Sequence, residues 1–592
     1  MSDLIREAPL GQFLRWASRN KLFQYPEERE GFVLPIQYII QLSSEKDVQP
    51  KYQPSIPLAP TPSTLSSADF TSLDTDLEGL GLGATRTKSR ADTMPYSSER
   101  FEVEQQLALE RTKTIPIAPK KTSDGIILVD WYTTDDVANP HNWSRAKRTF
   151  VTVVMCIYTW VVYTGSSIYA ASEGGVMERF SVNPTEAVLP LSLYVLAYGV
   201  GPLIFAPLSE IPVIGRNPVY YLTFILFFAL SFPTAVSNSF AGLLVLRFLQ
   251  GFFGSPALAN AGATFSDMYS LLYVPYPLSW WVFSAWGGPA LGPLMAGFAV
   301  SANNWRWSLW EIVWMAAPML VLLLLLMPET STPNILLRRA QRLRKLTGDS
   351  RLQAQSEIDQ RHLTASGILV DALIKPIEIT IKDPAIFFVN IYTALFYGIY
   401  YTFFEVFPLV FPPFYGFNLG EVGLAFLACQ VGATIGLLAY FAYLHWYMIP
   451  DNIAHGLRAQ EHRLVPAIVG SFFLPTGLFI FGWTARSDIH WIVPLIGVVI
   501  FVIGTFLILQ SIFVYVPLSY PQYAASLFAG NDLVRSAMAA GSILYARPLF
   551  VNLGIGKGIS VLAGLSTLGI FGMVAIYLTG AKLRARSKFA LS

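Results

Sequence analysis

Twelve apolar segments of about 20 residues each follow one another between Phe150 and the end of this 592-residue chain. A helix needs about 20 predominantly apolar residues to cross the hydrocarbon of a bilayer. Because lipid offers no partner for backbone amides, such segments are predicted to be helices. Only 14% of the residues are charged, whereas soluble proteins carry roughly 25%. The sequence therefore predicts an all-α membrane protein with twelve transmembrane helices.

The predicted helices form two groups of six, which indicates a duplicated bundle. Their expected spans are 149–171, 186–206, 218–238, 241–265, 276–300, 307–327, 385–411, 419–443, 464–485, 491–515, 523–549 and 559–580. By composition the chain divides into an N-terminal cytoplasmic segment (1–40), a disordered linker (41–123), a pre-membrane segment (124–148), a first half (149–327), a central cytoplasmic loop (328–384), a second half (385–580) and a basic tail (581–592). The linker is rich in Ser, Thr and Pro and has no apolar period. Within 3–24, apolar residues at helical spacing suit a helix on the membrane surface or one docked on the protein.

Lysine and arginine predict the orientation of the bundle. If the N-terminus is cytoplasmic, most basic loop residues, including the cluster 338–345 and the tail 582–588, lie inside the cell. The outside loops then contain only Arg179, Arg306, Arg486 and Lys557. By the positive-inside rule, both termini are expected in the cytoplasm.

Several classes of function lack support in the sequence. The net charge is +2 and no basic stripe is interleaved with aromatics, so nucleic acid is not an expected partner. The only cysteines, Cys156 and Cys429, lie in apolar segments and suit neither a disulfide framework nor a metal site. No P-loop GxxxxGK[ST] is present, which disfavours an ATP-driven pump. We expect no enzyme, no metal and no cofactor, with the energy coming from an ion gradient.

The stretch WWVFSAWGGPALGPLMAG (Trp280 to Gly297) combines apolar residues with helix-breaking ones. Gly288, Gly292 and Ala296 recur every four residues, so a helix presents them as a stripe that a neighbouring helix can approach closely. Pro289 and Pro293 lack an amide proton, and a bend is expected there. The stretch is either a moving part of a transporter or a packing seam.

The chain carries an ordered set of motifs: DWYTTDDVANPHNWSRAKR (130–148), GPLIFAPLSEIPVIGRNPVY (201–220), LRFLQGFFGSPALANAGA (246–263), GGPALGP (287–293), NNWRWSLW (303–310), the MPET after span six and KLRARSK (582–588). This set resembles the fungal drug:proton antiporters of the major facilitator superfamily, in the twelve-span group. The likeness is to pumps that confer resistance to benomyl, fluconazole and cycloheximide. The resemblance implies the major facilitator fold, with two six-helix halves.

The resemblance assigns roles to span five and to the loop between spans two and three. Gly287, Gly288, Pro289, Gly292 and Pro293 match the antiporter motif, and we expect the glycine stripe to face span eight or eleven of the other half. The loop matches a cytoplasmic latch.

The resemblance implies that the carboxylate of Glu210 caps a helix N-terminus and that Arg216, after Gly215, pairs with Asp267. Here Ile211 and Pro212 follow Glu210, whereas the superfamily pattern places an acid beside an arginine. The altered spacing leaves the partners open.

Ionisable residues inside spans are costly and are therefore functional candidates. The resemblance implies a role in proton coupling for Arg247, against the alternative of a structural anchor. Glu405 lies among aromatic side chains, where desolvation favours the neutral acid. Such an acid either carries the coupled proton or forms a hydrogen bond to a helix backbone. Asp532 and Arg535 share a helix face and form either a structural ion pair or part of the coupling site.

The substrate cavity is expected to be apolar and aromatic, which suits varied lipophilic compounds. In this fold spans 1, 4, 7 and 10 line it, with 2, 5, 8 and 11 beside them. The candidate lining residues are Tyr169, Tyr194, Tyr198, Trp286, Phe396, Tyr400 and Gln510.

The expected function is proton-driven export of lipophilic drugs or toxins by a plasma-membrane protein that acts as a monomer. Its partners are then small lipophilic molecules, protons and the lipid bilayer. Three alternatives stay open: export of a self-made secondary metabolite, proton-coupled transport of a polyamine or nutrient, and a transport-inactive membrane sensor.

Overall fold

The computed structural model describes residues 2–43, 96–110, 114–362 and 365–590. Helices occupy the six predicted spans of the first half. They are α6 (Arg145–Ser167) with η4 (Ile168–Ser172), α9 (Leu189–Val200) with α10 (Pro202–Glu210), α11 (Arg216–Ala235), α12 (Phe240–Gly254) with α13 (Pro256–Ala259) and α14 (Ala261–Met268), α15 (Pro275–Ala302) and α16 (Trp307–Leu326). The short helices α7 (Glu173–Phe180) and α8 (Pro184–Ala187) join the first two spans.

The second half repeats this pattern. Its helices are α20 (Pro384–Tyr415), α21 (Leu419–Ala425) with α22 (Leu427–Tyr443), the π-helical η6 (Leu444–Met448) and α23 (Ile449–His455), η7 (Gln460–Leu464) with α24 (Val465–Thr484), α25 (Ile492–Ser519), η8 (Pro521–Tyr523) with α26 (Ala524–Leu553), and α27 (Ile555–Arg586). The described helix ends differ from the predicted span ends by up to six residues, except that span eight continues through η6 and α23 to His455, twelve residues past its predicted end.

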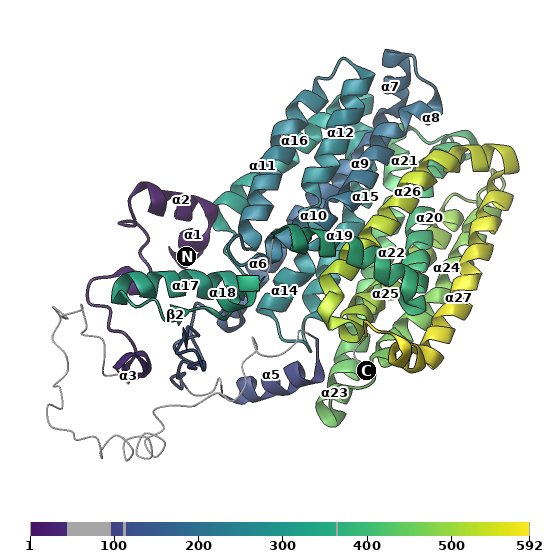
Figure 1. Ribbon diagram of the computed structural model, residues 1–592. Helices are drawn as coiled ribbons and strands as arrows, with labels where there is room; N and C mark the ends of the chain where they lie inside the picture. The colour runs from purple at the N-terminus through teal and green to yellow at the C-terminus, as the bar shows by residue number, and fades with distance from the viewer. Residues whose placement is uncertain (1, 44–95, 111–113, 363–364, 591–592) are drawn as a thin grey trace, which may run out of the picture.

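Figure 1 shows the two halves side by side, the first in blue to teal and the second in green to yellow. The end of the bundle at which α6 begins and α27 ends is called the terminal side, and the end with α7 and α8 the far side. Among the described residues, ten stretches are long and apolar enough to cross a membrane. The helices α15 and α26 are as long but less apolar, because α15 is rich in Gly, Pro and Trp and α26 carries Asp and Arg.

Glycine lets helices approach within backbone contact, as is common in membrane bundles. A Cβ added at Gly477 would lie 2.4 Å from the carbonyl oxygen of Gly497, and one added at Gly504 would lie 2.5 Å from that of Gly470. These pairs join α24 to α25.

The glycine stripe of α15 faces α6 of its own half, which corrects the prediction that it faces span eight or eleven. A Cβ at Gly288 would lie 2.5 Å from Cβ of Tyr163, and one at Gly292 would lie 2.2 Å from Oγ of Ser167. The other half meets α15 through a different glycine, because a Cβ at Gly297 would lie 2.7 Å from the carbonyl oxygen of Leu419 at the start of α21. Four-residue periodicity defines a smooth face but does not name its partner.

Three sequence segments build a small domain on the terminal side. They are the N-terminal α1 (Ser2–Glu7), α2 (Pro9–Ala17), η1 (Pro26–Glu28) and α3 (Ile36–Ser43); the pre-membrane β1 (Ile127–Leu128) and η3 (Pro140–Asn142); and the central-loop α17 (Thr332–Thr347), β2 (Leu352–Gln353), α18 (Gln355–Asp359) and η5 (Gln360–His362). The last helix of the central loop, α19 (Ala365–Lys382), packs against α10, α20 and α26 of the bundle instead. Strands β1 and β2 pair in parallel, with Ile127 opposite Leu352. Their core also buries Tyr38, Trp131 and Leu343, one from each segment.

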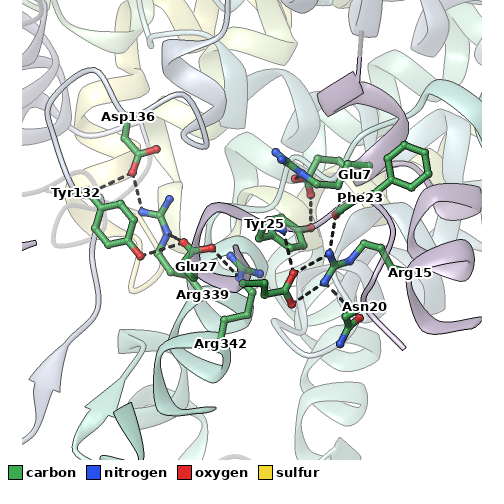
Figure 2. A network of polar contacts seen from close by, with 12 residues as sticks. Glu7, Arg15, Asn20, Phe23, Tyr25, Glu27, Tyr132, Asp136, Arg339 and Arg342 are labelled. Atoms are coloured by element: carbon green, nitrogen blue, oxygen red, sulfur yellow. Dashed lines mark hydrogen bonds and ion pairs between the residues drawn. The ribbon is translucent and has the colours of Figure 1, made fainter. Parts of the chain in front are cut away.

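Buried charges hold the N-terminal segment onto α17 (Figure 2). The Glu27 side chain is 1% exposed and lies 3.4 Å from Nε of Arg339 and 3.1 Å from Nε of Arg342. The Tyr132 hydroxyl donates to Glu27, and Arg339 donates to Asp136 at 2.7 Å. Burial alone would raise the pKa of Asp136, but the charge and hydrogen bond of Arg339 outweigh it and hold that pKa below the ordinary value.

Part of the amphipathic N-terminus is docked on the protein. Helix α2 packs against α11 and α16. Phe13 and Trp16 nevertheless remain 58% and 75% exposed on its outer face.

The prediction of a disordered linker over 41–123 is wrong for its second part. Residues 98–110 form α5 (Ser98–Glu110), whose Phe101 and Val103 are buried. Glu104 accepts a hydrogen bond from the backbone amide of Leu271 at 2.7 Å. Tertiary contacts supply the order that composition does not predict. Residues 44–95 of the predicted linker lie outside the described residues.

Candidate transport site

The centre of the bundle holds a buried ion pair on α26. Asp532 and Arg535 pair with each other and are 3% and 4% exposed. The Arg535 guanidinium lies 4.6 Å from the ring centroid of Tyr397 on α20. Within the described residues, Oδ2 of Asp532 has no hydrogen-bond partner, so this carboxylate is only partly satisfied. A buried, incompletely satisfied pair is costly, which favours a functional reason for its presence.

Tyrosine hydroxyls beside this pair connect the two halves. The Tyr198 hydroxyl of α9 lies 2.7 Å from that of Tyr397 and 2.8 Å from that of Tyr401, both on α20. The Tyr401 hydroxyl reaches Ser166 on α6 at 3.5 Å, and the ring of Tyr163 lies 5.6 Å from that of Tyr198. The hydroxyl cluster can be broken and remade when the halves move, because its members come from both.

A small central cavity of about 20 Å³ lies against this cluster, which is room for roughly one water. Trp286 of α15 and Tyr400 of α20 meet across it with ring centroids 4.4 Å apart. Other residues on its wall are Tyr163, Trp281, Val282, Ala285, Pro289, Tyr397, Leu509, Phe513 and Arg535. Aromatic side chains thus fill the centre, and a larger ligand requires them to move.

Arg247 is fully buried and is held by backbone and tyrosine. Its guanidinium donates to the carbonyls of Gly165 and Ser166 at 2.8 and 3.2 Å, where α6 ends. It lies 4.4 Å from the ring centroid of Tyr194 and 5.4 Å from that of Tyr169. This geometry ties span four to the end of span one.

The predicted cavity residues occupy different places. Trp286 and Tyr400 line the central cavity, and Tyr198 lies in the hydroxyl cluster. Tyr169 and Tyr194 lie under Arg247 instead, with their hydroxyls donating to backbone carbonyls of Ala187 and Val162. The remaining two predicted residues are buried: Phe396 lies beside Tyr392, and Gln510 has an amide without a hydrogen-bond partner among the described residues.

Glu405 is 2% exposed in α20. Its Oε1 has no hydrogen-bond partner in the described part of the chain. The neighbouring rings include Tyr401 and Phe404 on the same helix. An arginine of α26, Arg547, acts on it electrostatically.

The latch on the terminal side has a different capping residue from the predicted one. Arg216 pairs with Asp267 at 2.6 Å, which is the pairing that the sequence suggests. The carboxylate that caps α11 is Glu329, which accepts from the amides of Arg216 and Asn217 at 3.1 Å each. Gly215, at φ +80°, leaves room for it, since a Cβ there would lie 2.6 Å from Oε2 of Glu329.

Glu210 caps no helix among the described residues, which corrects its predicted role. It lines a cavity of about 380 Å³ on the terminal side. Helices α10 and α14 form one wall of this cavity, and the start of α26 forms the opposite wall. Tyr96, just before α5, and Arg100 and Glu104 on α5 also line it. Ligand pockets for small molecules commonly have such volumes.

On the far side the halves are in direct contact. Besides the approach of Gly297 to α21, a Cβ at Gly423 would lie 2.5 Å from the carbonyl oxygen of Pro293. The Ser192 hydroxyl of α9 donates to the carbonyl of Ala540 on α26 at 2.9 Å. The described conformation is therefore closed on the far side and hollowed on the terminal side.

Two helical halves around a buried, aromatic and charged centre define a multi-pass membrane transporter. Residues 155–542 match the Major Facilitator Superfamily, and the chain belongs to this family. It is 41% identical over 590 residues to an MFS-type transporter, pyvG, of Aspergillus violaceofuscus, with each chain covered completely.

Two further relatives carry names of drug resistance. The cycloheximide resistance protein of Candida maltosa is 35% identical with both chains covered completely. Fluconazole resistance protein 1 of Saccharomyces cerevisiae is 40% identical, over 78% of this chain and 84% of its own. A solved structure of the proton:xylose symporter XylE shares the fold, with a TM-score of 0.52 at 11% identity over 74% of this chain and 96% of that one.

Proposed function

We propose that this protein exports lipophilic drugs or toxins in exchange for protons, by alternating access of one central site. The observation that carries the proposal is the site between the halves, where aromatic rings surround the buried Asp532–Arg535 pair. Apolar rings bind ligands of different shape without directional contacts. Relatives named for cycloheximide and fluconazole resistance support the same substrate class.

The terminal side is then cytoplasmic, as the distribution of lysine and arginine favours. The 380 Å³ cavity between α10, α14 and α26 is the inner part of the pathway, and the central aromatic site binds the drug. The protein acts as a monomer in the plasma membrane, needs no cofactor and draws its energy from the proton gradient. Each ligand shifts the two conformations only by its difference in affinity for them.

Expression in a yeast strain lacking its own drug pumps tests this function. We expect lower accumulation of labelled fluconazole or cycloheximide than in cells with an empty vector. An uncoupler should restore the accumulation. Unchanged accumulation, or an uncoupler without effect, contradicts the proposal. A panel that adds benomyl and a polyamine determines the substrate range.

A further inference from the structure

Two carboxyl groups, one from each half, lie toward the far side of the bundle. Glu173 is the first residue of α7, directly after span one, and Glu405 belongs to α20 of the second half. Each has an Oε1 atom that is buried and lacks a hydrogen-bond partner among the described residues. The Tyr401 hydroxyl of α20 lies 3.5 Å from Oγ of Ser166, next to the end of α6. Glu405 lies one helical turn beyond Tyr401 on α20, and Glu173 follows the end of span one beyond Ser166. Both carboxyl groups therefore lie past the same contact between the halves, where their charges act on each other.

The start of α7 is anchored, which fixes the place of Glu173. The hydroxyl of Ser172, the residue before it, donates to the carbonyl of Trp305 at 2.7 Å and contacts the hydroxyl of Ser308. A Cβ at Gly175 would lie 2.5 Å from Cβ of Trp305, so this turn packs tightly against the start of α16. The backbone of Glu173 is therefore held in place, and its side chain is partly buried.

The surrounding charges do not neutralise two carboxylates. Among the described residues, Arg547 of α26 is the cation that acts on both Glu173 and Glu405. Tyr169 also faces Glu173, and beyond it lies Arg247, whose guanidinium is already engaged by two backbone carbonyls. Two carboxylates beside one nearby arginine leave one negative charge, and a buried uncompensated charge is costly. Binding of one proton removes it.

We propose that Glu173 and Glu405 share one proton and together form the coupling site at the outer gate, with Arg547 as their counter-ion. The inference rests on the proposed function for its place in an export cycle. With both groups ionised, repulsion across the halves favours an open far side. When a proton from outside binds to one carboxylate oxygen, the repulsion is lost and the far side can close, as it is in this structure. Closure after proton uptake is the step that returns an exporter to its inward-facing state.

The test measures protonation directly in purified full-length protein, without a drug. Infrared spectra recorded from pH 4 to 9 follow the protonated carboxyl band, and the difference between the wild type and Glu405→Gln isolates this site. Glu173→Gln removes the like charge while Arg547 stays, so we expect the remaining carboxyl to titrate about one pH unit lower. Arg547→Gln removes the cation, so the expected shift is of similar size toward higher pH. The matched control is Glu178→Gln, which replaces an exposed acid on α7, the helix of Glu173. This variant should leave the titration of the carboxyl band unchanged.

Opposite shifts in the two variants, with an unchanged control, support the shared site. An unshifted titration of Glu405 in Glu173→Gln overturns it, and so does an unshifted titration in Arg547→Gln if the first variant does not fold. Addition of fluconazole to the same samples tests the proposed function separately. If the carboxyls titrate as a pair but no drug releases a proton, drug:proton exchange fails while the paired site stands.

Discussion

Replacement of Gly288 by alanine tests the close contact between α15 and α6. The added Cβ would lie 2.5 Å from Cβ of Tyr163 and 2.7 Å from the backbone nitrogen of Thr164. Carbon atoms in ordinary contact are about 3.5–4.0 Å apart, so the helices must separate locally by about 1 Å. Overpacking of this kind costs about 1–3 kcal/mol, whereas alanine gains roughly 0.5–1 kcal/mol over glycine in a helix.

The matched control is Gly564→Ala in α27, where nothing lies within 4 Å of the added atom. Both variants gain the helix-propensity term, so their difference isolates the overpacking cost of about 1–3 kcal/mol. Unfolding of the purified proteins in increasing SDS, followed by circular dichroism, measures it. We expect Gly288→Ala to unfold first, and the larger Gly292→Leu to abolish transport while still inserting into membranes. Equal stability of the two alanine variants would refute the reasoning.

Three further predictions concern buried polar contacts. Glu27→Ala breaks a buried pair with Arg339 and should cost about 3 kcal/mol, seen as faster proteolysis of the N-terminal segment; unchanged cleavage would contradict the network. Because the pKa of Asp136 is lowered in the folded protein, its contribution to stability is present above its ordinary value of 3.8 and is lost as pH falls below it. Asp136→Asn should therefore remove an acid-dependent unfolding step from a fluorescence titration. If the step persists in the variant, another acidic group causes it and the prediction is wrong. Tyr198→Phe loses hydroxyl contacts of 2.7 and 2.8 Å and should cost about 1 kcal/mol per bond and change the efflux rate; wild-type stability would show that Tyr401 and its neighbours do not need this hydroxyl.

Hydropathy predicts the membrane helices well because the bilayer imposes one length and one polarity on every span. Even α15 and α26, which are less apolar than the rest, follow from the spacing of their neighbours. The Arg216–Asp267 pair was also within reach of sequence, because the matched loop and the end of span four supply both partners.

Partners that are far apart in the sequence were not predictable. Nothing in the periodicity of the first 43 residues points to Arg339, and composition hides the order of α5. The stripe of Gly288 and Gly292 indicated a close neighbour but not α6. The span pattern does not point to Glu173, because this residue follows the end of the predicted first span. The MPET motif by itself does not indicate that Glu329 caps a helix.

Proton-coupled export can be measured with purified protein in liposomes that have an acidic lumen and a neutral bath. We expect labelled fluconazole or cycloheximide to accumulate in the lumen while a trapped pH indicator reports loss of protons. Without a pH difference, accumulation should cease. Drug entry that is the same with and without the gradient, or that proceeds without proton loss, would contradict proton-coupled export.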